Sequence, residues 1–197
     1  MGGWWRGGGR SGEPDPAKIL NLSLGGPSAA CPALLQGAIN PARNTFGATV
    51  VVAAGNDAAN AAGTTPANCA GVITTGATDR QVNRASYSNF GATVEICAPG
   101  GETSPLVANG VLSTLNNGAT VPAVSIYKQY QGTSMATPHV AGVVALMQHA
   151  RMQHLKALLT PAQVLLHLKA KVLPPALMCG KGLLDARASV AAAIAAP

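Results

Sequence analysis

The chain has 197 residues, of which 48% are hydrophobic and 10% charged, so it is long enough to bury the core of one folded domain. This composition excludes an intrinsically disordered chain, and the net charge of +6 comes from cations scattered along the sequence rather than from a basic block. We therefore expect no nucleic-acid partner, and no membrane span, because no apolar stretch reaches the roughly 18 residues that a bilayer requires.

Residues 1–16 are predicted to be an irregular leader that precedes a domain at residues 17–197. The leader is rich in Gly and contains Pro, and both residues disfavour helix and strand. Residues 1–12 lack the apolar segment of a secretory signal peptide, so we expect no export signal in this chain. The leader is interpreted either as read-through from a displaced start or a damaged gene, or as a natural disordered extension.

The first half of the domain is predicted to contain several strands and one helix. Residues 19–24 form a short strand that ends at Gly-Gly-Pro, and residues 32–46 form a helix weakened by Pro41, whose ring clashes with the preceding turn. Residues 49–54 are continuously apolar and rich in β-branched side chains, which is typical of a strand buried on both faces. Further strands are predicted at residues 71–76, 85–88 and 93–97.

The second half is predicted to be mainly helical after a long loop. Residues 102–130 show no clear period and are predicted to be loop. A helix is expected from Ser134 to about residue 150, with Pro138 in its first turn, where a missing N–H is harmless. Thr160 followed by proline predicts a second helix, and residues 185–195 a third. This order of elements predicts an α/β layered fold with a mainly parallel sheet.

The four cysteines are far apart in the sequence and form no CxxC pair, so a zinc ribbon or a thioredoxin-type motif is not expected. Their even number fits two disulfides in an oxidising compartment, or alternatively four buried free thiols. The cysteines are Cys31, Cys69, Cys97 and Cys179.

The strongest chemical signal surrounds Ser134, which follows a Gly-Thr turn and opens a helix. A hydroxyl at this place lies in the field of the positive helix end, and the N–H of the same residue is not used by the helix. That N–H can face a developing negative oxygen, as an acyl-transfer nucleophile requires. A serine that only caps the helix is the alternative. The full string is Gly132-Thr133-Ser134-Met135-Ala136-Thr137-Pro138-His139-Val140-Ala141-Gly142.

This string resembles the nucleophile motif of the subtilisin-like serine proteases, and the resemblance extends over most of residues 17–190. Ser23-Leu24-Gly25-Gly26-Pro27 resembles the substrate-binding strand of that family. Ala53-Ala54-Gly55-Asn56 resembles its oxyanion-hole segment, and Gly182-Leu183-Leu184-Asp185-Ala186 resembles the start of its C-terminal helix. The resemblance implies a subtilisin-like three-layer α/β fold whose N-terminal part is missing from this chain.

The resemblance also implies roles for individual residues. Ser134 would attack the scissile carbonyl, while its backbone N–H and the Asn56 amide would bind the tetrahedral oxyanion. Taken alone, Asn56 is better interpreted as a turn residue, and only its combination with the Ser134 motif favours the oxyanion role. Tyr130 is either a contact on the leaving side or a loop aromatic, and His139 is expected to be structural. The residues implied for substrate binding are Ser23, Leu24, Gly25, Ala53, Ala54, Gly55, Gly132 and Thr133.

Further expectations follow from the same resemblance. Bacterial secreted members carry a disulfide like Cys31–Cys69, and we predict Cys97–Cys179 as the second pair. The chemistry requires no cofactor; structural calcium occurs in the family, but no acidic cluster here is dense enough to assign a site, so metal ligands are unknown. The intact parent would be an extracellular monomer that cleaves polypeptides.

The histidine and aspartate of the catalytic triad are expected to be absent, because the family order is Asp, His, Ser and no histidine precedes Ser134. We therefore expect an endopeptidase by resemblance that is inactive as an isolated chain. The alternative is a non-catalytic remnant or interaction module derived from a protease gene. An α/β-hydrolase needs a histidine after its acid, and none follows Asp185; Ser125-x-x-Lys128 lacks the companion motifs of a β-lactamase.

Overall fold

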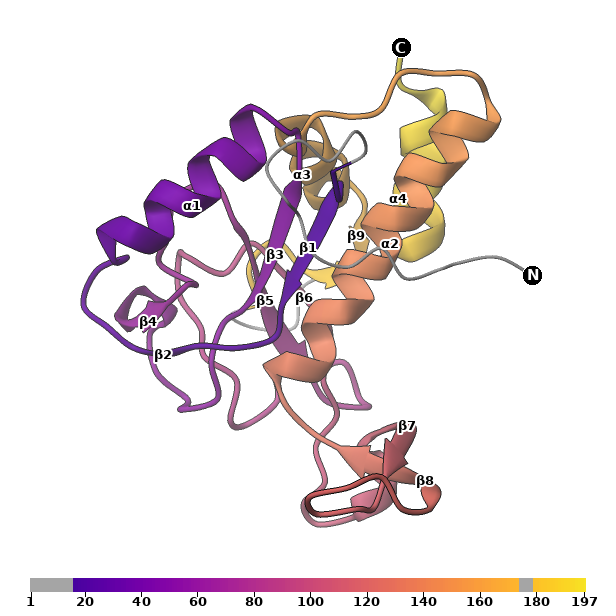
Figure 1. Cartoon of the computed structure of the whole chain (residues 1–197). Coiled ribbons are helices and arrows are strands. Elements are labelled where there is room, and N and C mark those ends of the chain that lie inside the picture. The colour runs from indigo at the N-terminus through magenta and orange to yellow at the C-terminus, as the bar shows by residue number, and fades with distance from the viewer. Residues whose placement is uncertain (1–15, 174–178) are drawn as a thin grey trace.

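The computed structural model describes residues 16–173 and 179–197, and most of the predicted leader lies outside them. A six-stranded sheet forms the centre of the fold (Figure 1), and it is parallel except for the edge strand β9. Among the described residues, β1 pairs with β3 alone. In spatial order the strands are β1 (Ile19–Leu22), β3 (Thr49–Ala53), β5 (Ile73–Thr78), β6 (Ile96–Pro99), β10 (Leu183–Leu184) and β9 (Val172–Leu173).

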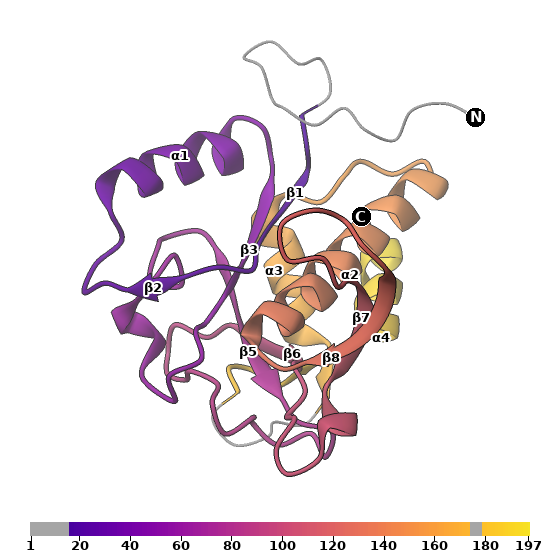
Figure 2. The same cartoon turned by 60° about the horizontal axis from the view of Figure 1, so that its bottom comes forward.

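Helices cover both faces of this sheet and make a three-layer α/β fold, as predicted. Successive side chains of a strand point to opposite faces. In β3, Val51 packs into the core beneath α2, α3 and α4, whereas Val50 and Val52 pack into the core beneath α1. Figures 1 and 2 show α1 on one side of the sheet and α2 with α4 on the other. The helices are α1 (Ala33–Asn44), α2 (Thr133–Gln153), α3 (Pro161–Ala170) and α4 (Ala186–Ala195).

The ends of the helices follow their capping residues. Thr160 and Gln163 form a reciprocal capping box at the start of α3, and the Asp185 carboxylate accepts a hydrogen bond from the N–H of Ala188 in α4. Helix α1 continues through Pro41 for almost one further turn, so this proline does not break it. No helix in the described part of the chain is both long and apolar enough to cross a lipid bilayer.

The prediction of a loop at residues 102–130 is wrong. The segment contains the short helix η2 (Val107–Asn109) and an antiparallel hairpin of β7 (Val111–Asn116) and β8 (Ser125–Tyr130), which projects beyond the start of α2 in Figure 1. The Asn116 side chain closes the long connection by accepting hydrogen bonds from the N–H groups of Gly118 and Ala123. Because most of the ribbon is exposed on both faces, its residues show no alternation of apolar and polar side chains.

Two further predictions need correction. Residues 85–88 form no strand, because they turn between β5 and β6 and use their side chains to bind other segments. Pro138 lies in the second turn of α2, since the helix begins at Thr133. The short elements β2 (Gly26–Pro27), η1 (Ala61–Gly63) and β4 (Thr64–Thr65) were not predicted, and β2 pairs antiparallel with β4.

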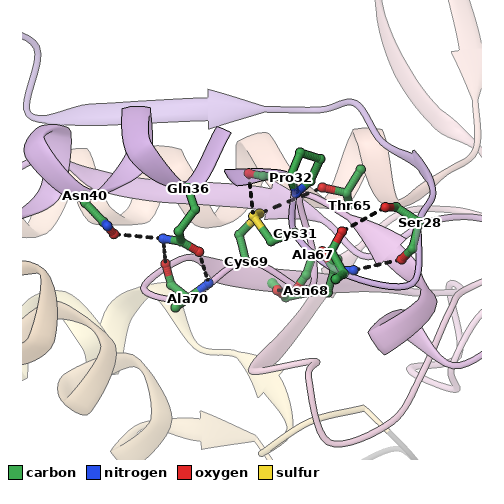
Figure 3. Close-up of a disulfide and its surroundings, with 12 residues drawn as sticks. Ser28, Cys31, Pro32, Gln36, Asn40, Thr65, Ala67, Asn68, Cys69 and Ala70 are labelled. Carbon is green, nitrogen blue, oxygen red and sulfur yellow. Dashed lines mark hydrogen bonds between the residues drawn. A yellow bond between two sulfur atoms is a disulfide. The ribbon is translucent and has the colours of Figure 1, made fainter. Parts of the chain in front are cut away.

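Both predicted disulfides are present, Cys31–Cys69 and Cys97–Cys179. The first joins the segment before α1 to the loop before β5. Beside it, the Gln36 amide accepts from the N–H of Ala70 and donates to its carbonyl, so a covalent bond and two hydrogen bonds connect the same two segments (Figure 3). The second joins β6 to the segment before β10, and both of its cysteines are buried.

Replacing both cysteines of either pair by alanine should lower the free energy of unfolding by about 3–5 kcal/mol, because each bridge restricts the unfolded chain. The bridges join residues 38 and 82 positions apart, and the longer loop predicts the slightly larger loss for Cys97→Ala/Cys179→Ala. Urea unfolding of the wild type and the two double variants measures this. Losses below about 1 kcal/mol for both pairs would contradict the prediction.

Candidate active site

Ser134 is the second residue of α2 and follows the buried turn residue Gly132. Gly132 has a φ of 148°, a backbone conformation that residues other than glycine rarely adopt. The first N–H groups of a helix have no partner within the helix, and among the described residues no acceptor is assigned to the N–H of Ser134. The turn therefore presents both a hydroxyl and a free N–H at the positive end of a long helix.

Two reciprocal hydrogen bonds join Ser134 to Ser23, in the strand-like segment after β1. The Ser134 hydroxyl donates to the Ser23 carbonyl at 3.2 Å, and the Ser23 hydroxyl donates to the Ser134 carbonyl at 2.9 Å. Pro138 explains the second bond, because a residue with an N–H at that position would bind the Ser134 carbonyl within the helix. The side chain of Ser23 instead satisfies the oxygen that Pro138 leaves free.

The amide of Asn56 is held in one orientation by Thr133. The N–H of Thr133 donates to Asn56 Oδ1 at 2.8 Å, and the Thr133 hydroxyl donates to the same oxygen at 3.0 Å. That hydroxyl in turn accepts the N–H of Gly55 at 3.2 Å. With Oδ1 turned toward two donors, the NH₂ group of Asn56 is left as a donor for another molecule.

The two free donors lie near one point. A β-carbon placed on Gly132 would be 3.6 Å from the Ser134 nitrogen and 3.7 Å from Asn56 Nδ2. The same position is 3.7 Å from Asn56 Oδ1, so the Ser134 nitrogen and the Asn56 amide both lie next to the Gly132 turn. Two N–H donors that converge next to a hydroxyl can stabilise an oxygen that becomes negative when the hydroxyl attacks a carbonyl.

Ser134 and Asn56 also line a common cavity of about 360 Å³. Its walls come from the segment after β1, the end of β3, and the start of α2. Of the residues predicted to bind substrate, Leu24, Gly25, Ala53, Gly55 and Thr133 line this cavity. Of the remaining wall residues, Gly26 and Pro27 belong to the segment that resembles the substrate-binding strand, whereas Asp57 and Thr64 were not predicted.

Three of the predicted substrate residues do not line this cavity. Ser23 binds Ser134 as described, and Gly132 is buried in the turn. Ala54 directly follows β3 and is completely buried, because its side chain points to the face opposite that of Ala53, into the core beneath α1. Thr64 reaches the cavity through the pairing of Pro27 with Thr64, a contact between two-residue strands that leaves no periodic signal in the sequence.

None of the four histidines is bonded to Ser134 in the described residues. His139 is exposed on α2, and its Nδ1 lies 2.8 Å from the Met135 carbonyl, as expected of a residue outside the chemistry. Tyr130 is exposed in β8 beside Lys128 and does not line the cavity. The carboxylate among the cavity residues is Asp57.

Tyr87, from the turn between β5 and β6, supports the start of α2. Its hydroxyl accepts the N–H of Gly132 at 2.9 Å and donates to the carbonyl of Gly101 at 2.6 Å. Burial raises the pKa of Tyr87 well above its ordinary value of 10.0; the hydrogen bond from Gly132 opposes the rise and the Glu102 carboxylate adds to it. The folded state therefore favours the neutral phenol, which donates one hydrogen bond and accepts another.

Residues 4–183 match the family described as Subtilase family. An extracellular protease of Xanthomonas campestris pv. campestris is 48% identical over 97% of this chain and 32% of the relative's length. Subtilisin Savinase of Lederbergia lenta is 38% identical over 87% of this chain and 55% of its own length. The match begins at residue 4, inside the predicted leader, and the domain boundary at residue 16 stays a prediction.

Solved structures of proteases also align with this chain. A protease from Pseudoalteromonas arctica aligns with a TM-score of 0.84 and 44% identity, over 95% of this chain and 55% of that one. The self-cleaved protease domain of PatA aligns with a TM-score of 0.75 and 27% identity, over 90% of this chain and 62% of its own. This chain therefore spans from about a third to less than two thirds of the lengths of these proteins.

Tyr87 should make the stability of the fold depend on pH above 10. A phenol whose pKa is raised by folding contributes its full stabilisation below the ordinary pKa of 10.0, and this contribution is lost as the pH rises toward the folded-state pKa. At about pH 8 the variant Tyr87→Phe should be less stable by about 0.5–1.5 kcal/mol, because the Gly101 carbonyl loses its donor, whereas the Gly132 N–H keeps the Gly100 carbonyl as an acceptor. The difference in unfolding free energy between wild type and variant should be smaller at about pH 11 than at about pH 8.

Urea unfolding of the wild type and the variant at both pH values measures the difference. Tyr127→Phe is the matched control, because Tyr127 is 74% exposed and its phenol meets water in both states. A stability difference for Tyr87→Phe that stays constant over this pH range would contradict the assignment.

Proposed function

The chain belongs to the subtilase family, and from this membership and the geometry of the cavity we propose that it carries the nucleophile and the oxyanion-binding part of a serine endopeptidase. The observation that supports this most directly is the position of the Ser134 hydroxyl beside two free N–H donors, its own and that of Asn56. Both side chains line one cavity, which leaves room for a substrate carbonyl.

In the proposed reaction Ser134 Oγ forms a bond to the carbonyl carbon of a peptide, and the carbonyl oxygen becomes negative. The Ser134 N–H and Asn56 Nδ2 stabilise that oxygen. The peptide C–N bond then breaks, the leaving amine takes a proton, and an ester remains on Ser134. Water hydrolyses this ester by the same route and returns the serine hydroxyl.

The reaction needs a base that receives the Ser134 proton, and this sequence has no histidine before Ser134. In the structure the hydroxyl donates to the Ser23 carbonyl, which is too weak a base to remove the proton at neutral pH. We propose that the isolated chain is inactive and that an aspartate and a histidine from outside its 197 residues complete the site.

The substrate is proposed to be an extended polypeptide. Gly25 and Gly26 leave backbone exposed along one wall of the cavity, and a peptide in extended form can bind such a segment as an added strand. The wall residues are small apart from Leu24, and Thr64 and Asp57 add polar groups. Secretion is proposed with the same function, because two relatives are named extracellular proteases, and a monomeric state is proposed from the family resemblance alone.

No cofactor takes part in the proposed chemistry, since the nucleophile and the oxyanion donors are protein groups. Within residues 16–173 and 179–197, no three His, Cys, Asp or Glu side chains come together as metal ligands. We therefore assign no residues to the structural calcium that occurs in the family.

A non-catalytic remnant or interaction module is the second candidate. The observation that favours it is the absence of any histidine before Ser134. The two candidates differ in whether the site becomes active once the remaining part of a related protease is supplied.

The purified chain should show no Ser134-dependent cleavage of a chromogenic peptide. A chimera in which the chain replaces the matched 198-residue segment of the Xanthomonas protease should be active. Removal of the nucleophile in the chimera, Ser134→Ala, should lower kcat by about a millionfold, a magnitude measured in this family. The unmodified relative is the positive control.

Turnover by the isolated chain at the rate of the relative would disprove the proposed inactivity. A chimera that folds, as judged by circular dichroism, and yet cleaves nothing would favour the non-catalytic remnant.

Loss of the Asn56 donor should slow the chimera without weakening substrate binding. In Asn56→Ala we expect kcat to fall by about 10²–10³ with little change in KM, a magnitude also measured in this family. Asp57→Ala is the control, because Asp57 lines the same cavity but its side chain offers no N–H. Equal effects of the two substitutions on kcat would argue against an oxyanion role for Asn56.

A further inference from the structure

Asn89 is a buried residue in the turn between β5 and β6, with only 1% of its surface exposed. Its side chain makes all four hydrogen bonds that an amide can make to the surrounding protein in this site. Oδ1 accepts from the N–H groups of Asp57 at 2.9 Å and Ala59 at 3.0 Å, while Nδ2 donates to the Ala54 carbonyl at 2.9 Å and to Thr64 Oγ1 at 3.1 Å. A fully bonded buried amide is a rigid connection, because each broken bond leaves a polar group unpaired.

These bonds surround Asn56 on both sides in the sequence. The Ala54 carbonyl precedes Asn56, and the Asp57 and Ala59 N–H groups follow it. The backbone N–H of Asn89 adds a bond to the Gly55 carbonyl at 3.0 Å. One residue therefore holds the loop at four points without touching the Asn56 side chain.

The conformation of this loop needs such support. Gly55 has a φ of 105° and Ala58 a φ of 50°, and the second value lies in the left-handed region that alanine rarely adopts. A β-carbon on Gly55 would lie within 2.3 Å of Asn89 Nδ2, so the glycine also makes room for the asparagine. Gly55 and Asn89 therefore pack against each other and together determine the backbone conformation that leads to Asn56.

We infer that Asn89 is a positioning residue for the oxyanion donor: it fixes the backbone on both sides of Asn56 so that Nδ2 faces the space beside Ser134. This inference rests on the proposed function. Thr133 sets the rotation of the Asn56 amide, and Asn89 sets the location of the backbone that carries it. Both are required, because an oxyanion donor misplaced by about 1 Å loses much of its effect.

The test uses the ¹⁵N-labelled full chain, so it does not depend on activity. In Asn89→Ala, amide hydrogen exchange at Asp57 and Ala59 should accelerate by about tenfold or more beyond the change in global stability. The side-chain NH₂ resonances of Asn56 should shift, although Asn56 makes no bond to Asn89. The matched control is Gln148→Ala, which removes a buried amide whose two bonds go to Leu159, far along α2 from Ser134.

Where Asn89→Ala does not fold, Asn89→Asp replaces it, because it keeps the size of the side chain and an oxygen at the Oδ1 position. Exchange at Asp57 and Ala59 should then still accelerate more than in Gln148→Ala, because the second carboxylate oxygen faces the Ala54 carbonyl to which Nδ2 donates in the wild type. Exchange and Asn56 resonances that match those of Gln148→Ala would overturn the inference and make Asn89 a general core residue.

The active chimera gives a second readout. There, Asn89→Asp should lower kcat by about tenfold or more and leave KM within about twofold, whereas Gln148→Ala should change neither. Equal kcat values for Asn89→Asp and Gln148→Ala would also overturn the inference. An inactive wild-type chimera would instead count against the proposed function, and the amide measurements would still decide the role of Asn89.

Discussion

The hydrogen bonds from Thr133 to Asn56 Oδ1 connect the two segments on which the site depends. One segment is the first turn of α2, with Ser134, and the other is the loop after β3, with Asn56. Because the amide oxygen is occupied by donors from Thr133, the NH₂ group has to face away from them. The same contact therefore fixes the distance between nucleophile and donor and determines which end of the amide is available.

Much of the fold was predictable from residue patterns because its central elements are buried on both faces. The apolar run of β3 and the Thr160-Pro161 start of α3 are local signals with direct physical causes, and both predictions are confirmed. The β7–β8 hairpin was not predicted. Its strands lie largely in water, and its connection, residues 117–124, is longer than the two-residue turns that Asn-Gly sequences signal, so neither an apolar alternation nor a tight turn marks the pairing.

The residues of the site likewise divide into those marked by a local sequence motif and those placed by contacts between distant segments. Ser134 and Asn56 were predicted because each belongs to a continuous motif, and the structure brings them together. Thr64, Tyr87 and Asn89 are joined to the site by hydrogen bonds and a short strand pair that span 25 or more residues of sequence, which no local pattern reveals. Ala54 was assigned to the pocket because it stands in the motif, but the alternation of side chains along β3 turns it into the core.

The paired hydrogen bonds between Ser23 and Ser134 have a mechanical consequence. Ser23 precedes Leu24 and Gly25, which line the cavity, so a displacement of that edge is transmitted to Ser134 through these two hydrogen bonds. The cavity edge and the Ser134 hydroxyl are thus connected directly through Ser23. A peptide bound along Leu24 and Gly25, as proposed above, would therefore shift the Ser134 hydroxyl together with Ser23.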